Sequence, residues 1–151
     1  EMQKLLDILV HSLYTEREIF LRELLSNSAD ALSKVQFLAL TSADQLLNPD
    51  ASLQIELSFD EDKQTITIED TGCGMTREEL IENLGTIASS GTLKFLREAQ
   101  QSKQAVQNLI GQFGVGFYAV FMVADKVELI TRSWGPDSQA WSWNCQWEWS
   151  V

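Results

Sequence analysis

The chain has 151 residues, of which 44% are apolar, so it is long enough for one domain with a hydrophobic core. Its 22 acidic and 11 basic residues give a formal net charge of -11, which repels nucleic-acid phosphates and excludes non-specific DNA binding. Two cysteines favour a reducing compartment over a disulfide framework, and the longest apolar run, 115–124, is too short to span a membrane.

Two helices are predicted in the first part of the chain. The segment 3–14 repeats leucines at helical spacing and predicts a short helix. Thr15 and Glu18 have the spacing of a capping box, and apolar residues continue at helical spacing after them. A long helix is therefore predicted to start near residue 16.

A hairpin and a further helix are predicted next. The segments 53–59 and 65–70 alternate polar and apolar residues with period two, and residues 60–64 separate them as a turn. Thr76 and Glu79 form a second capping-box pattern, which predicts a helix over 75–85.

The remaining elements are shorter. We expect residues 85–111 to form a lid-like connection with some helix, a brief helix after Gly116, and a strand over 126–133. Pro49 and Pro136 are expected in turns.

The tail, 141–151, places its tryptophans at positions of one parity. A continuous strand would gather these indoles on one face, and packing on the core is a better interpretation of that face than a ligand platform. A hairpin that turns at 144–146 is the open alternative, since Asn favours turns.

The long helix carries a polar stripe with apolar residues on both sides. The stripe has residues at i, i+4, i+7 and i+11, and a half-buried stripe of this kind requires polar partners. The alternative is an ordinary solvated face. The stripe consists of Glu23, Asn27, Asp30 and Lys34.

The strand over 65–70 ends in a carboxylate that glycines follow. Asp70 is placed at the edge of a sheet, and Gly72 and Gly74 allow another group to approach the backbone closely. A plain turn remains the alternative for this Asp-Thr-Gly sequence.

Three glycines, Gly111, Gly114 and Gly116, precede a predicted helix. Backbone N–H groups in such a loop bind phosphate oxygens, although glycine clusters also serve close packing. The loop is neither a Walker loop nor the dinucleotide fingerprint. In so acidic a chain, a bound polyanion requires local compensation, and a divalent cation held by an oxygen ligand such as Asn27 is expected.

Three stretches together resemble the N-terminal ATP-binding domain of the ninety-kilodalton heat-shock chaperone family. They are "EIFLRELLSNSADAL", "DTGCGMTREELIENLGTIASSGT" and "IGQFGVGFYAVFMVADKV". The resemblance covers residues 3–133 and is greatest to the bacterial and mitochondrial branches, through "KLLDILVHSLY" and "FMVADKVE". It implies a location in the cytoplasm or the mitochondrial matrix.

The resemblance implies an α+β fold, a two-layer α/β sandwich of the Bergerat type. A mixed, mainly antiparallel sheet is covered on one face by helices that hold the nucleotide. We expect one ATP-binding domain over 1–151, with a lid over about 85–111.

The resemblance also assigns residues to ATP or ADP and Mg²⁺. Glu23 would orient or deprotonate the attacking water, Asn27 would ligate the magnesium ion, and Asp70 would accept a hydrogen bond from the adenine amino group. Gly74 and Met75 would lie close to the base. The other nucleotide-binding candidates are Asp30, Lys34 from the helix stripe, Asn83, Lys94, Gly111, Gln112, Phe113, Gly114, Val115, Gly116 and Phe117.

The implied function is ATP binding and slow ATP hydrolysis in a chaperone cycle for protein folding, with client proteins, co-chaperones and a homodimeric parent protein. We expect the chain by itself to be a truncated, monomeric module with weak or no turnover, because another domain of the family supplies the catalytic arginine. Cys73 stands where the family has an aliphatic residue and adds a modifiable thiol. The alternatives are an inactive nucleotide-binding or client-binding fragment, and a gyrase-like or kinase-like ATPase.

Overall fold

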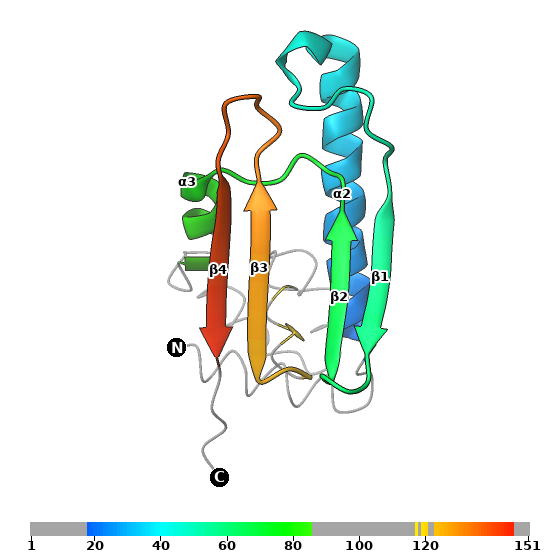
Figure 1. Ribbon diagram of the computed structural model, residues 1–151, viewed down its shortest axis with the longest axis vertical. Helices are drawn as coiled ribbons and strands as arrows, with labels where there is room; N and C mark the ends of the chain where they lie inside the picture. The colour runs from blue at the N-terminus through cyan, green and yellow to red at the C-terminus, as the bar shows by residue number, and fades with distance from the viewer. Residues whose placement is uncertain (1–17, 86–116, 118, 121–122, 147–151) are drawn as a thin grey trace, which may run out of the picture. The chain divides into compact units, whose positions relative to one another are not determined.

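The structure is a computed structural model that describes residues 18–85, 117, 119–120 and 123–146 (Figure 1). The predicted helix over 3–14, the Thr15 capping position and nearly all of the predicted lid lie outside these residues. The chain divides into two compact units. One contains residues 1–23, 81–129 and 144–151, and the other contains residues 24–80 and 130–143.

The elements follow one another in an α+β order, as predicted. Helix α2 (Ile19–Thr41) and the short 3₁₀ helix η1 (Ala43–Gln45) precede strands β1 (Ile55–Asp60) and β2 (Thr65–Asp70). Helix α3 (Arg77–Leu80) continues into a π-helical turn η2 (Ile81–Gly85), and strands β3 (Lys126–Arg132) and β4 (Ala140–Gln146) follow. Among the described residues, no helix is both long and apolar enough to cross a membrane.

Helix α2 confirms the predicted long helix. It begins at Ile19, and the amides of Leu21 and Arg22 both donate to the Glu18 carbonyl at 3.1 Å. At its other end, the amide of Ser42 donates to the Leu38 carbonyl at 2.7 Å. The helix therefore starts slightly later than predicted.

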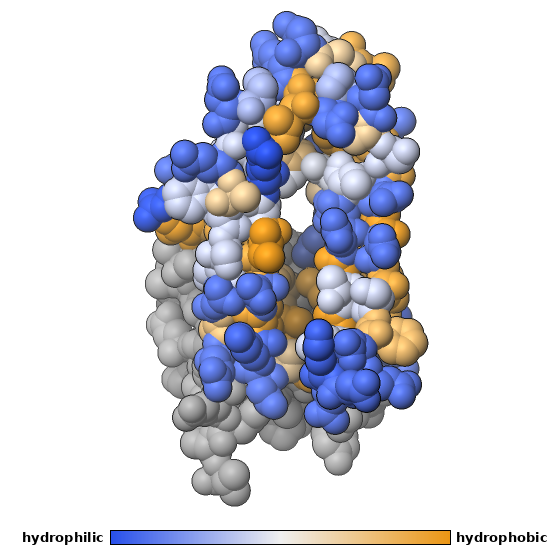
Figure 2. All heavy atoms as spheres, in the orientation of Figure 1, coloured by the Kyte–Doolittle hydropathy of each residue, from blue (hydrophilic) through white to orange (hydrophobic). Residues whose placement is uncertain are grey.

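Strands β1 and β2 form the predicted antiparallel hairpin. Asp60 pairs with Thr65 beside the turn, and Ile55 pairs with Asp70 at the other end. The Asp60 carboxylate accepts a hydrogen bond from the Lys63 amide at 3.0 Å. Hydrophilic side chains gather at this turn (Figure 2). The register thus leaves Asp70 at the open end of the hairpin, where the chain enters the loop 71–75.

The loop 71–75 is tied to the segment before β1 by Thr71. The Thr71 hydroxyl donates to the Ser52 carbonyl at 2.7 Å and accepts from the Gln54 amide at 2.9 Å. The amide of Thr71 also donates to the Gln54 carbonyl at 3.1 Å. The exit of β2 is therefore fixed.

Helix α3 begins with the predicted capping box. The Thr76 amide donates to the Glu79 carboxylate at 2.8 Å, and the Glu79 amide donates to the Thr76 hydroxyl at 3.2 Å. This reciprocal pair satisfies two amides that the start of a helix leaves unbonded. Leu80, in the same helix, is buried and anchors it.

The strand β3 and the tail strand β4 are hydrogen-bonded neighbours. Trp141, Trp143 and Cys145 are half-buried, and the residues between them are exposed. This alternation shows that the tail is a continuous strand as far as Gln146, without a turn at 144–146. Within the described part of the chain, the predicted sheet therefore consists of two separate two-stranded sheets.

Both prolines occupy turns, as predicted. The Ala51 amide donates to the Asn48 carbonyl at 3.2 Å around Pro49, and the Ser138 amide donates to the Gly135 carbonyl at 3.1 Å around Pro136. In each turn proline is the second residue, where its fixed φ angle fits.

We predict that Gly74→Ala lowers the free energy of unfolding by about 2–4 kcal/mol, because a methyl group there would overlap the Arg132 carbonyl and a side chain would be strained at φ +61°. Gly72→Ala should lower the free energy of unfolding by about 1–3 kcal/mol, since the added methyl group would overlap Ala31. Urea unfolding measures both changes. Gly135→Ala is the matched control, because nothing lies within 4 Å of the added carbon. Equal stability of the Gly74 and Gly135 variants would contradict this account.

Candidate functional site

The carboxylate of Asp70 is held in one orientation at the end of β2. Its Oδ1 atom accepts a hydrogen bond from the Gly72 amide at 2.9 Å. The Oδ2 atom has no hydrogen bond to any described residue, and the side chain is exposed. Asp70 therefore presents a fixed carboxylate oxygen that can accept a hydrogen bond from a ligand.

The loop after Asp70 crosses helix α2 at Ala31. The Cys73 amide donates to the Ala31 carbonyl at 3.1 Å, and Gly72 contacts Ala31 closely enough to exclude a side chain. A carbonyl oxygen has two lone pairs, so Ala31 can accept this bond in addition to its helical one. The loop and the helix are therefore joined through their backbones.

Three residues of the predicted stripe surround this crossing point. Asp30 precedes Ala31, Asn27 lies one turn before it, and Lys34 lies one turn after it. All three side chains are exposed. The span from Asn27 to Lys34 is about 10 Å along the helix axis, which is comparable to the length of a nucleotide's phosphate chain with its sugar.

The pKa of the Cys73 thiol shows which charges lie around the loop. Burial raises this pKa above its ordinary value of 9.0, the positive charge of Lys34 opposes the rise, and the charges of Glu79 and Asp70 add to it. Lys34 and Asp70 therefore act on the same thiol. Helix α2 and the end of β2 thus contribute charged groups to one neighbourhood.

The far end of the loop is held by the β3 segment. The Met75 amide donates to the hydroxyl of Thr131 at 2.9 Å, and Thr131 is buried. Gly74 packs against the Arg132 carbonyl with a positive φ of 61°. Gly74 and Met75 are thus positioned by contacts that their own backbones make.

The structure brings six of the predicted site residues around this loop: Asn27, Asp30, Lys34, Asp70, Gly74 and Met75. Three other predicted site residues lie elsewhere along the described part of the chain. Glu23 is half-buried near the start of α2, Asn83 is exposed in η2, and Phe117 is half-buried. The remaining candidates lie outside the described residues: Lys94, Gly111, Gln112, Phe113, Gly114, Val115 and Gly116.

Sequence reasoning missed two threonines that position the site. Thr71 fixes the exit of β2, and Thr131 holds Met75. A signal for Thr131 was present, because it shares its strand parity with Val127 and Leu129, and a polar residue at such an inward position requires a partner. For Thr71, the sequence contained no specific signal, because a threonine between Asp70 and Gly72 is also typical of an ordinary turn.

The acidic and thiol side chains described here form no cluster of three or more that could hold a metal ion. Asn27 nevertheless suits magnesium, because its exposed amide oxygen is a hard ligand. Mg²⁺ commonly takes one or two protein ligands and completes its shell with phosphate oxygens and water. Among the described residues, Asn27 can thus hold a magnesium ion together with phosphate oxygens and water.

Comparisons with known proteins found matches over most of the chain. A family model described as "Histidine kinase-, DNA gyrase B-, and HSP90-like ATPase" matches residues 14–149. The chain is 59% identical over 144 residues to the Chaperone protein HtpG of Chlorobium phaeobacteroides, a match that covers 95% of this chain and 23% of that protein.

Further relatives carry the same name. The HtpG of Oleidesulfovibrio alaskensis is 55% identical over 143 residues, which cover 95% of this chain and 22% of that protein. The HtpG of Rhodospirillum rubrum is 54% identical over 147 residues, which cover 95% of this chain and 23% of that protein. The chain thus spans less than a quarter of the length of these curated relatives.

We predict that iodoacetamide modifies Cys73 more slowly in the folded chain than in the urea-unfolded chain at the same pH. Burial raises the pKa of the thiol above 9.0, so less of the reactive thiolate is present in the folded state. The folded rate should continue to rise with pH after the unfolded rate has levelled off. The measurement uses Cys145→Ser, so that Cys73 is the single thiol. Equal rates in both states would contradict the prediction.

Proposed function

This chain belongs to the family of histidine kinase-, DNA gyrase B- and HSP90-like ATPases, and we propose that it binds ATP and ADP between the loop 71–75 and helix α2. The observation that carries the proposal is the fixed carboxylate of Asp70 beside a loop whose backbone is bonded to α2. A base that enters next to this loop meets a preoriented acceptor on one side. A phosphate chain can extend along the polar face of α2.

Asp70 is proposed to recognise the adenine. The exocyclic amino group of adenine donates hydrogen bonds, and the Oδ2 atom of Asp70 is an acceptor for one of them. Gly74 and Met75 follow the carboxylate directly and would contact the base, with Asn83 as a further pocket residue. The hydrogen bond from Gly72 to Oδ1 keeps the carboxylate in place before the nucleotide arrives.

The polar face of α2 is proposed to serve the phosphates. Asn27 would ligate Mg²⁺, Asp30 and Lys34 would line the nucleotide on this face, and Glu23 would orient or deprotonate the attacking water. Phosphoryl transfer requires positioning and charge stabilisation more than covalent participation by the protein, so this set of groups suffices in principle. Lys94 and the segment 111–117 are proposed to complete the phosphate site.

We place this nucleotide site in a chaperone cycle, because the similar proteins from three bacterial species carry the name Chaperone protein HtpG. The chain matches less than a quarter of each of them, so client proteins, co-chaperones and a homodimeric parent protein are parts of the proposal. The bacterial origin of the relatives favours the cytoplasm over the mitochondrial matrix.

We predict that Asp70→Asn weakens ADP binding at least about tenfold, because it replaces a charged acceptor with an amide that also presents donors to the adenine amino group. Glu23→Ala should retain binding and lose any hydrolysis, since its role concerns the attacking water. Isothermal titration with ADP and with Mg-ATP measures the first effect, and phosphate release measures the second.

Asp44→Asn is the matched control, because it makes the same substitution at an exposed carboxylate in η1. Unchanged affinity in a folded Asp70→Asn variant would overturn the adenine contact. Absence of binding in the unsubstituted chain, with its fold verified, would favour the alternative of an inactive or client-binding module.

We further predict that Asn27→Ala removes the contribution of magnesium to ADP affinity. The unsubstituted chain should bind ADP more tightly with Mg²⁺ than with EDTA, because the ion links the phosphates to the protein. The variant should bind equally under both conditions. A magnesium effect of full size in Asn27→Ala would show that another residue holds the ion.

A further inference from the structure

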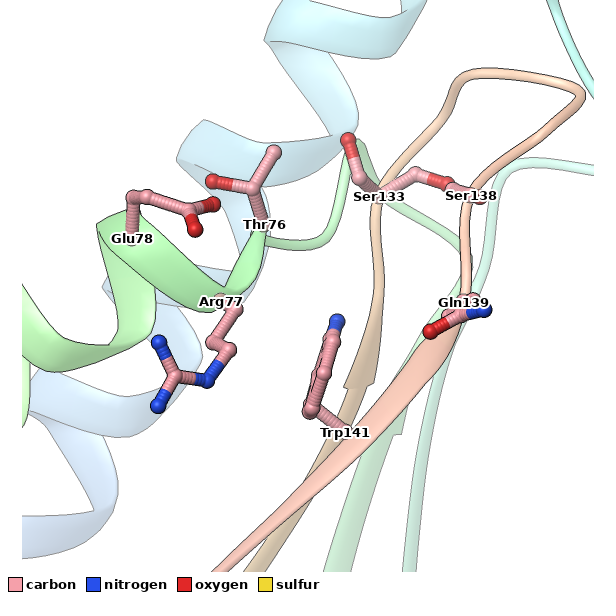
Figure 3. Close-up of a pocket in the computed structure, with 7 residues that line it drawn as sticks. All are labelled: Thr76, Arg77, Glu78, Ser133, Ser138, Gln139 and Trp141. Atoms are coloured by element: carbon pink, nitrogen blue, oxygen red, sulfur yellow. The ribbon is translucent and has the colours of Figure 1, made fainter.

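A pocket lies beside helix α3, and none of its residues belongs to the nucleotide site proposed above. Figure 3 shows the residues that line it, and its volume is about 230 Å³. Ligand sites for drug-sized molecules have volumes of roughly 300–1,000 Å³, so this pocket fits one amino-acid side chain or a group of similar size. It is lined by Thr76, Arg77, Glu78, Ser133, Ser138, Gln139 and Trp141.

An arginine and a tryptophan form one wall of the pocket. The guanidinium carbon of Arg77 lies 5.7 Å from the centroid of the Trp141 ring. The two side chains come from α3 and β4, and the indole nitrogen is directed to the side where Thr76 and Ser133 lie (Figure 3). Stacking of this kind restricts the guanidinium group and leaves its N–H groups available to a ligand.

Two further donors lack hydrogen-bond partners within the described part of the chain. They are the indole N–H of Trp141 and the hydroxyl of Ser133, a residue that is only 8% exposed. Buried polar groups in folded proteins are usually hydrogen-bonded, so the buried hydroxyl of Ser133 indicates a site for a ligand, and the half-buried indole N–H of Trp141 offers this ligand a second donor.

The neighbouring hydroxyl groups are already engaged. Thr76 accepts from the amide of Glu79, and Ser138 donates to the Ser133 carbonyl at 2.6 Å. The Nε atom of Arg132 donates to the Ser138 carbonyl at 3.1 Å. These bonds hold the walls of the pocket and leave Arg77, Trp141 and Ser133 to contact a ligand.

Glu78 supplies the opposite kind of group, because its exposed carboxylate lines the same pocket. The lining therefore carries one positive and one negative side chain. A ligand with an acceptor at one end and a donor at the other satisfies both of them.

We propose that this pocket binds a primary carboxamide, the side chain of a glutamine or asparagine on a partner protein. Its carbonyl oxygen accepts hydrogen bonds from Arg77 and the Trp141 indole, and its amino group donates to Glu78. A carboxylate would meet the charge of Glu78 and the net charge of -11, and an ammonium group would meet Arg77. A neutral carboxamide avoids both repulsions.

The test follows the backbone amides of residues 76–78 and the tryptophan indole resonances by NMR in the 151-residue chain. Two probes are titrated at millimolar concentrations, N-acetyl-glutamine methylamide and N-acetyl-glutamate methylamide. We expect the glutamine probe to shift these resonances to saturation. It should bind at least about tenfold more tightly than the glutamate probe, because the contact with Glu78 is a hydrogen bond for the carboxamide and a repulsion for the carboxylate.

Matched variants assign the contacts. Glu78→Gln and Arg77→Gln should each weaken the glutamine probe about tenfold, because each removes one charge-assisted hydrogen bond. Trp141→Phe retains the ring under Arg77 and removes the indole N–H, so it should weaken the probe less. Glu61→Gln makes the same charge change in the β1–β2 turn and should leave binding unchanged. Urea unfolding verifies that each variant is folded.

Three results would overturn the proposal. Tighter binding of the glutamate probe, with a further gain in Glu78→Gln, would identify a carboxylate site. Binding of free glutamine without binding of the capped probe would identify a small-molecule site instead of a protein contact. Absence of shifts with both probes would show that the pocket takes neither group.

Discussion

The close approach of one loop to two other segments is the constraint on which the site depends. The Ala31 carbonyl accepts from the Cys73 amide, the Cys73 carbonyl accepts from the Trp134 amide, and the Trp134 carbonyl accepts from the Leu47 amide. This relay uses only backbone groups, so it ties α2, the loop 71–75 and the segments beside them together without regard to side-chain identity. Gly72 and Gly74 make the approach possible, because any side chain there would occupy the space of Ala31 or Arg132.

The relay also explains why Asp70, at the end of β2, has a carboxylate with one orientation that can bind a ligand. A carboxylate in an ordinary turn has several orientations, whereas here Gly72 is fixed by its contact with Ala31 and its amide bonds Oδ1. Preorganisation of this kind removes an entropic cost from ligand binding. Cys73 takes part in the relay through its amide and carbonyl groups, so this contribution does not depend on its side chain.

Local patterns in the sequence predicted the elements, and non-local contacts escaped prediction. The pair Thr76 and Glu79 is three residues apart, so its capping box could be recognised directly and is confirmed. The hairpin ending in Asp70 is confirmed for the same reason. The bond between Met75 and Thr131 joins residues 56 apart, and no spacing rule identifies such a partner. The placement of Arg77 over Trp141 also depends on how β4 lies against α3, and the alternation of tryptophans alone could not predict it.

The segment 70–78 joins the proposed nucleotide site to the proposed carboxamide pocket. Asp70 begins it, the loop 71–75 follows, and Arg77 and Glu78 open α3. Coupling between two sites requires an element with two arrangements that each ligand favours differently. A shift of this loop would break the bonds of Cys73 to Ala31 and of Met75 to Thr131, and would move Gly74 away from the Arg132 carbonyl. The tight packing of the loop therefore favours two sites that are occupied independently, with the glycines serving as a rigid link between them.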